Sequence, residues 1–228
     1  MSSPRQVKMK ALLSIPRLGF TDNLLCCARN FLPLGIHIVS HSGAFWEQSL
    51  TKLMQVCIED GDDYLVTVDY DSIFTQAQFL ELLRLIESSG ADAVFPVQMR
   101  RDSKNVLTTI HPSEVVDGKW DTSKALVKAR SGHFGLTIIR CASLAKMPKP
   151  WLWSTPDPSN GQWDTQGPGR FDADVGFWMT ATEHLNWRVY LANNVRIGHI
   201  QRVITWPTAD WTIKHQFMDE YDREGVPV

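Results

Sequence analysis

The stretch YLVTVDYDSIF, from Tyr64 to Phe74, decides the fold. Its first five residues, Tyr64–Val68, are mostly apolar and are typical of a buried strand. Two acids follow, Asp69 and Asp71, with one aromatic residue between them. Residues two apart in a strand point to the same side, so we expect the two carboxylates to converge at its carboxyl end. That end is where ligands bind in open parallel sheets.

Strand-like and helix-like segments alternate around this stretch. Strands are predicted at residues 10–16, 35–40, 64–68 and 91–97. Helices are predicted at residues 22–31, 45–61 and 75–90. The strands are apolar without alternation, which indicates burial on both faces. The pattern therefore predicts an α/β fold with a mostly parallel central sheet flanked by helices.

The second half of the chain has a more mixed pattern. The Asp-Gly pair inside residues 115–120 predicts a hairpin. Further along the chain we expect a strand at 133–140, a loop at 154–170, a helix at 172–187, strands at 188–192 and 195–200, and mixed signals from 206 on. No internal repeat or linker interrupts the chain, so a single domain is the simplest interpretation.

The acids at 69 and 71 have no evident structural task. One of them could cap the following helix, but Thr75 and Gln78 already have the spacing of a capping box. Two carboxylates brought together are unfavourable unless a cation or hydrogen-bond donors satisfy them. Divalent cations take oxygen ligands, so the pair predicts a metal site.

Composition excludes several classes of protein. With 23 basic and 25 acidic side chains the net charge is −2, which gives no overall basic field for nucleic acid. The four cysteines form no CxxC pair, so we expect neither a zinc site nor a disulfide framework but a reduced, cytoplasmic compartment. The N-terminal apolar run is too short for a signal or a membrane span. The chain has no GK[ST], GxGxxG, HExxH or GxSxG motif.

Four segments together resemble the glycosyltransferases of the GT-A fold. Asp-x-Asp after a buried strand is similar to their nucleotide-sugar site, and IPRLGF (Ile15–Phe20) resembles the segment that borders the base. Gly132–Trp153 resembles the segment around the acceptor site, and Asp172–Ile200 resembles the catalytic helix and late histidine of family 2 members. The resemblance spans residues 10–200. It is to a compact, core-only enzyme of bacterial or phage type.

The resemblance implies a donor and a metal. The donor is a nucleotide diphosphate sugar, with UDP as the expected carrier, and the cofactor is Mn²⁺ or Mg²⁺. Asp71 and His199 would hold the metal, and Asp69 would position the ribose or a metal-bound water. The other donor contacts implied by the resemblance are Pro16, Arg17, Tyr70 and His133.

The resemblance also implies a catalytic base and an acceptor site. Where the family often has Glu-Asp, this chain has Ala173-Asp174, which favours Asp174 as the base of an inverting displacement and leaves Asp172 able to share or take the role. The expected acceptor contacts are Gly135, Trp151 and Trp153. The acceptor itself could be a glycan, a protein, a lipid, a metabolite or a modified nucleobase.

The expected organisation is one domain, 1–228. Residues 1–100 would bind the nucleotide sugar, 101–205 would form the acceptor and catalytic half, and 206–228 would be a C-terminal tail. The enzyme would act in the cytoplasm, that of the host if the protein is viral.

Each of these residues also has a structural alternative. The acids near residue 173 lie where helices favour Asp as a cap. His199 could be packed in its strand, His133 could end a turn, Arg17 could be solvated, and the tryptophans could fill the core. Alternative functions are a nucleotidyltransferase, a two-metal nuclease, and a non-catalytic sugar-binding or nucleic-acid-binding module.

Overall fold

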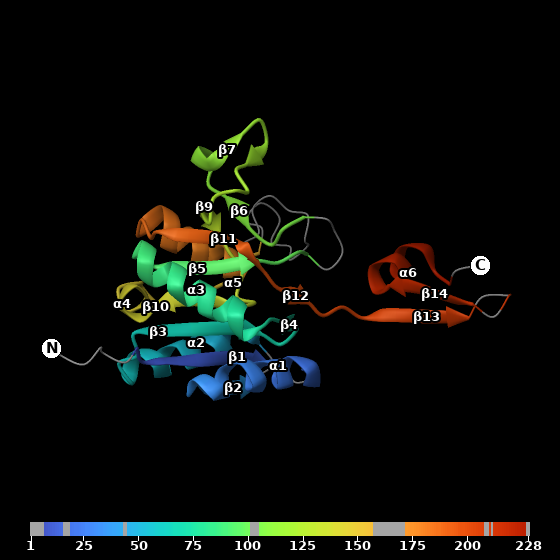
Figure 1. The fold of residues 1–228 in the computed structure, drawn as a ribbon, viewed down its shortest axis with the longest axis horizontal. Helices are drawn as coiled ribbons and strands as arrows, with labels where there is room; N and C mark the ends of the chain where they lie inside the picture. The colour runs from blue at the N-terminus through green and yellow to red at the C-terminus, as the bar shows by residue number, and fades with distance from the viewer. Residues whose placement is uncertain are drawn as a thin grey trace.

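The computed structural model describes residues 7–15, 19–42, 45–100, 105–156, 172–207, 210 and 212–226. Within them lies an eight-stranded sheet with the order β2-β1-β3-β10-β5-β11-β9-β6. The strands β2, β1, β3, β5 and β11 run parallel to one another, and β10 is inserted antiparallel between β3 and β5. The expected α/β architecture with a mixed second half is confirmed (Figure 1).

The first half matches the sequence pattern closely. Its elements are β1 (Met9–Ile15), α1 (Thr21–Phe31), η1 (Leu32–Leu34), β2 (His37–Ser42), α2 (Trp46–Glu59), β3 (Tyr64–Asp69), β4 (Ser72–Ile73), α3 (Gln76–Ser89) and β5 (Ala93–Val97). The predicted capping box at the start of α3 is present, and Gly90 ends that helix with a positive φ.

The second half differs from the prediction in several places. Its strands are β6 (Thr109–Ile110), β7 (Val115–Val116), β8 (Lys119–Trp120), β9 (Leu126–Ser131), β10 (Thr137–Arg140), β11 (Val189–Arg196), β12 (Gly198–His199), β13 (Val203–Pro207) and β14 (Ile213–Phe217). Its helices are η2 (Pro112–Glu114), α4 (Cys141–Leu144), α5 (Ala173–Met179), the π-helical η3 (Thr180–His184) and α6 (Met218–Glu224).

Two differences stand out against the predicted elements. The two strands predicted at 188–192 and 195–200 are one strand, β11, with a register shift between Ala192 and Arg196, followed by the short β12. The segment from residue 206 on, expected as a tail, belongs to a hairpin, β13–β14, with α6 behind it. Figure 1 shows this hairpin projecting away from the sheet. Most of the loop predicted at 154–170 lies outside the described residues.

Helices cover both faces of the sheet because its strands are apolar on both sides. In β1, Leu12 packs with α2 in one hydrophobic cluster, whereas Ala11 and Leu13 pack with α1 and α3 in the other. The same alternation continues in β3. This arrangement leaves the carboxyl ends of β1, β3 and β5 at one edge, where the polar residues gather.

Candidate functional site

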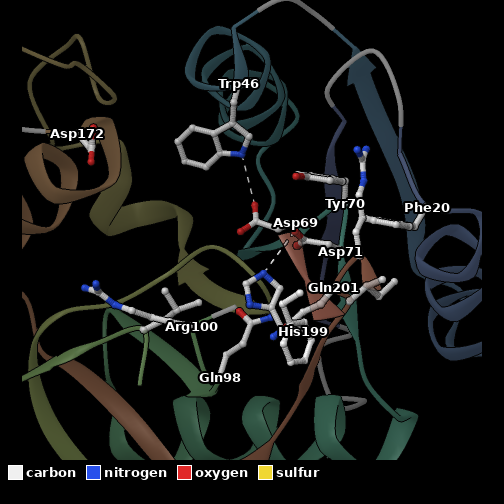
Figure 2. A pocket seen from close by; sticks show the side chains of 14 residues that line it. Phe20, Trp46, Asp69, Tyr70, Asp71, Gln98, Arg100, Asp172, His199 and Gln201 are labelled. Atoms are coloured by element: carbon white, nitrogen blue, oxygen red, sulfur yellow. Dashed lines mark hydrogen bonds and ion pairs between the residues drawn. The ribbon is translucent and has the colours of Figure 1, made fainter. Parts of the chain in front are cut away.

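A pocket of about 810 Å³ lies at the carboxyl edge of the parallel strands. Its lining includes Asp69, Tyr70 and Asp71, which follow β3, together with His199 of β12. Asp172, at the start of α5, lies on the lining as well. Figure 2 shows Asp69, Asp71 and His199 close together and Asp172 farther along the wall. The pocket therefore collects residues from both halves of the chain.

The closest approach between the predicted metal ligands joins Asp71 and His199. The Asp71 carboxylate is buried, and its Oδ2 lies 3.3 Å from His199 Nε2. The other ring nitrogen, Nδ1, donates to the carbonyl of Met99 at 2.9 Å. A neutral imidazole that donates from Nδ1 presents a lone pair at Nε2, so two electron-rich atoms face each other. A proton or a cation between them removes this repulsion.

Asp69 points in a different direction from Asp71. Its Oδ1 accepts a hydrogen bond from the indole Nε1 of Trp46 at 3.3 Å. The alternation of side chains along a strand cannot be the reason why both acids reach the pocket. The strand β3 ends at Asp69, and Asp71 lies in the turn that follows it. Both acids still reach the pocket. Among the described residues, no three His, Cys, Asp or Glu side chains are spaced to hold a metal ion together.

The Asp71–His199 pair nevertheless has the chemistry of a divalent site. A carboxylate oxygen and an imidazole nitrogen suit Mn²⁺ and related ions. Two ligand atoms that are each about 2.1 Å from a common ion, at roughly right angles, are about 3 Å apart. The observed separation of 3.3 Å is close to this value. The two residues present thus fit a divalent cation whose other ligands come from elsewhere.

Asn23 of α1 holds the turn that carries Asp71. This side chain is 1% exposed, and its Nδ2 donates to the carbonyl of Asp69 at 2.9 Å and to that of Ser72 at 2.7 Å. On the other side, Asp71 accepts a backbone hydrogen bond from Ile200 at 2.7 Å, next to the β4–β12 pairing. Gln98 Nε2 donates to Ser72 Oγ at 3.1 Å. The turn is therefore fixed from three elements.

Asn23→Ala is expected to destabilise the protein by about 1–3 kcal/mol, since a buried carbonyl group (Ser72) and a partly buried one (Asp69) lose their donor. This change is measured by urea unfolding, with the slope of the unfolding free energy against urea concentration held equal for the two proteins. The matched control is Asn194→Ala, whose exposed side chain bonds Glu81, and for which a loss below about 0.5 kcal/mol is expected. Equal losses in the two variants would contradict the role of Asn23.

His133, predicted as a donor contact, lies in the core behind the pocket. Its Nε2 donates to the carbonyl of Pro96 at 2.9 Å, and its Nδ1 accepts from the amide of Gly135 at 3.0 Å. Burial lowers the pKa of His133 from 6.5 to about 4. Both nitrogens are occupied by backbone groups, so the side chain fixes the turn between β9 and β10.

This lowered pKa makes stability depend on pH. The neutral form is favoured in the folded state, so the contribution of His133 is complete above about pH 6.5 and falls as the pH drops toward 4. The loss is at most about 1.4 kcal/mol per pH unit. The free energy of unfolding in urea is measured for the wild type and for His133→Asn from pH 7 to 4.5. The difference between the two removes the contributions of the other titratable groups. We expect the stability difference to shrink as the pH falls, and parallel curves would contradict this.

The predicted acceptor residues do not line the pocket. Gly135 is buried, and a side chain there would overlap the Gln98 amide oxygen. Trp151 is a core residue that donates from Nε1 to the Met147 carbonyl at 3.1 Å. Trp153 is partly exposed and packs against Gly176 in α5. The contacts of Trp151 are consistent with the structural alternative that the tryptophans fill the core.

The two acids of α5 differ in their surroundings. Asp172 is exposed at the N-cap position, but its side chain forms no capping hydrogen bond. Asp174 is not on the lining, and its carboxylate accepts from the amide of Val175 at 2.8 Å. Burial, with a smaller contribution from the charge of Asp172, raises the pKa of Asp174. Pro16 and Arg17 lie outside the described residues.

Sequence reasoning missed several lining residues, namely Trp46, Gln98, Arg100, Arg202 and Phe217, and it included Phe20 only as the end of the segment Ile15–Phe20. Phe20 and Tyr70 form a parallel aromatic pair, with ring centroids 6.0 Å apart and 2° between the planes. The rule that ligands bind at the carboxyl ends of parallel strands could have identified Gln98 and Arg100, since both follow β5. No local signal marks Arg202 or Phe217.

No family model matches the sequence, and no curated protein matches it. Solved structures do share its fold. The crystal structure of A197 from STIV has a TM-score of 0.60 and 15% identity, with 90% of this chain and 93% of that chain covered. The crystal structure of GalNAc-T7 with UDP, GalNAc and Mn²⁺ has a TM-score of 0.52 and 10% identity. That match covers 86% of this chain but only 44% of the other.

The chain has the GT-A fold. At these identities the likeness concerns the fold alone. Among the described residues, no helix combines the length and the apolar composition needed to span a bilayer.

Proposed function

We propose that the protein is a metal-dependent glycosyltransferase that moves a sugar from a nucleotide diphosphate sugar, with UDP as the carrier, to an acceptor hydroxyl. The observation that carries the proposal is the buried Asp71 carboxylate 3.3 Å from His199 Nε2, at the ligand-binding edge of a GT-A sheet. The structural neighbour with UDP, GalNAc and Mn²⁺ supports the donor class. We further propose that this enzyme is similar to family 2 glycosyltransferases, is of bacterial or phage type, and acts in the cytoplasm.

Asp71 and His199 would hold the cation. When bound, a divalent ion at this place neutralises the charge that develops on the leaving diphosphate. Met99 keeps the His199 ring oriented through its carbonyl, and Asn23 keeps the Asp71 turn in place. These contacts mean that the chain orients its own ligand atoms before any donor arrives.

Other lining residues suit the rest of the donor. The parallel rings of Phe20 and Tyr70 offer flat apolar surface for a nucleobase. Arg100 and Arg202 bring positive charge to the same pocket, which would favour the binding of a diphosphate there. In this proposal the first half of the chain binds the nucleotide sugar, and the acceptor enters from the second half.

The start of α5 would supply the general base. The sequence favours Asp174, whereas the pocket lining favours Asp172, whose side chain does not cap the helix. We therefore assign the base to Asp172. Asp174, with its raised pKa, is the adjacent acid. The Asp172 carboxylate would remove the proton of the acceptor hydroxyl as its oxygen attacks the anomeric carbon. Attack from the side opposite the diphosphate inverts the configuration of that carbon.

Two matched variants test this assignment. Asp172→Asn is expected to retain metal-dependent donor binding and to lose turnover by about 10²–10⁴-fold, the usual contribution of a general base. Asp174→Asn is expected to lose much less. Donor binding is measured by calorimetry, and turnover by release of the nucleoside diphosphate. The reverse order of losses would return the role to Asp174.

A screen of nucleotide sugars tests the function itself. A donor that binds only the folded state raises the melting temperature by mass action, and we expect the rise to require Mn²⁺ or Mg²⁺. Stabilisation by the metal alone, with no response to nucleotide sugars, would favour a nuclease. Stabilisation by nucleoside triphosphates in preference to nucleotide sugars would favour a nucleotidyltransferase. Equal donor binding in EDTA would remove the metal from the proposal.

A further inference from the structure

The outer face of α1 and η1 is apolar and uncovered in the described structure. Leu24 is 50% exposed, Leu25 43%, Leu32 58% and Leu34 37%. Leu24, Ala28 and Leu32 are spaced four residues apart, so they form one row along the helix, and Leu25 lies beside that row. Four exposed leucines within eleven residues form a contiguous patch, which is typical of an interaction surface.

A charge pair flanks this row on one side. At 100° per residue, Asp22 and Arg29 lie 20° apart around the helix axis, next to Leu25. They are seven residues apart, which is about 10 Å along the axis. Neither side chain forms a hydrogen bond or an ion pair with another residue that the structure describes. The acid lies in the first turn of α1 and the base in the last.

This pattern is complementary to itself. If two copies of α1 pack antiparallel about a two-fold axis, the same flank of each helix lies on the same side of the interface. If the two-fold axis passes between Leu25 and Cys26, Asp22 of each copy lies opposite Arg29 of the other. Residues 22 and 29 are equally far from that point along the helix. The small Ala28 lies beside Leu24 of the second copy and lets the helix axes approach closely. A two-fold interface is the common arrangement of homodimers.

We propose that this patch binds a second copy of the same chain through antiparallel α1 helices. Leu24, Leu25 and Ala28 supply the apolar area between the two helices, and the two Asp22–Arg29 pairs fix the direction and register of the helices. This interface goes beyond the proposed function and does not depend on it. The opposite face of α1 carries Asn23, so one helix would serve both the interface and the Asp71 turn.

A charge-swap series tests the register. Sedimentation equilibrium at low and high salt measures the dissociation constant of the full-length dimer. Asp22→Arg and Arg29→Asp each create two like-charge contacts, so each is expected to weaken association by about tenfold or more at low salt. The double variant Asp22→Arg/Arg29→Asp restores opposite charges at both contacts. We expect it to regain a dissociation constant within about threefold of the wild type.

An apolar-to-polar variant tests the leucine patch. Leu25→Ser is expected to weaken the dimer by tenfold or more, whereas the control Val116→Ser, at a site 72% exposed in the β7–β8 hairpin, should not. Thermal melts identify any variant that fails to fold. A wild-type chain that stays monomeric at all concentrations would overturn the proposal, as would a double variant no tighter than the single ones. A monomer whose binding to anionic vesicles is lost in Leu25→Ser would assign the patch to a membrane surface instead.

Discussion

Asp71→Asn should lose metal-dependent donor binding and at least about a hundredfold in turnover. The substitution keeps the size of the side chain and removes the charge that a divalent ion and its diphosphate require. Because Asp71 is only 2% exposed and lies 3.3 Å from His199, no other described acid replaces it at that point. Calorimetry with a UDP-sugar in Mn²⁺ and in EDTA measures the loss. Release of UDP with water as the acceptor measures turnover.

The matched control is Asp117→Asn, which lies in the exposed β7–β8 turn with a φ of 50° that asparagine also accepts. This control should bind donor like the wild type. Melting temperatures without ligand separate a damaged site from a damaged fold. If Asp71→Asn binds the donor with unchanged affinity and metal dependence, the Asp71–His199 pair is not the donor site.

Trp178→Ala should produce the largest loss of stability among the core substitutions considered. Trp178 is fully buried in α5, and its ring contacts Phe95, Phe134 and Phe177 with centroids 5.0–6.0 Å apart. Removing it leaves a large cavity between α5 and the sheet, which costs about 3–5 kcal/mol. For a domain of this size each kcal/mol shifts the melting temperature by about 2–4 °C, so a fall of about 6–20 °C is expected.

Trp178→Phe separates the ring from its polar group. The indole Nε1 has no hydrogen-bond partner within the described part of the chain, so its removal leaves no acceptor unsatisfied. We expect less than half the loss seen with alanine. Trp153→Ala, at a partly exposed position outside α5 that packs against Gly176 of that helix, is the surface control and should also cost less. Equal losses for alanine and phenylalanine at Trp178 would show that polar contacts dominate there.

Local patterns were sufficient to predict the first half of the fold. Thr75, Gln78 and Gly90 define both ends of α3 through contacts within a few residues, and Asp117-Gly118 defines a hairpin in the same way. These signals depend on backbone chemistry that is local in sequence. The hairpin β13–β14 has no comparable signal, since its strands VITWP and IKHQF show no regular alternation of apolar and polar residues. The strand β9 was missed although its residues alternate between buried and exposed from Val127 to Arg130.

The site could be predicted only in outline. The resemblance implied that Asp71 and His199 lie close together, and they do. The argument that Asp69 and Asp71 point the same way assumed that both belong to one strand, but β3 ends at Asp69. His133 and Trp151 have the right residue types for ligand contacts. Their hydrogen bonds to Pro96 and Met147, which only the folded chain reveals, place both in the core.

The β4–β12 pairing has a consequence for how the protein is made. Ser72 pairs with His199, so the Asp71 turn is completed by a strand 127 positions later in the chain. During synthesis the N-terminal part emerges first. A ribosome-bound chain that stops short of His199 thus carries the acid without its imidazole. The Asp71–His199 pair can therefore form only after residue 199 has been synthesised, when every strand of the eight-stranded sheet already precedes it in the chain.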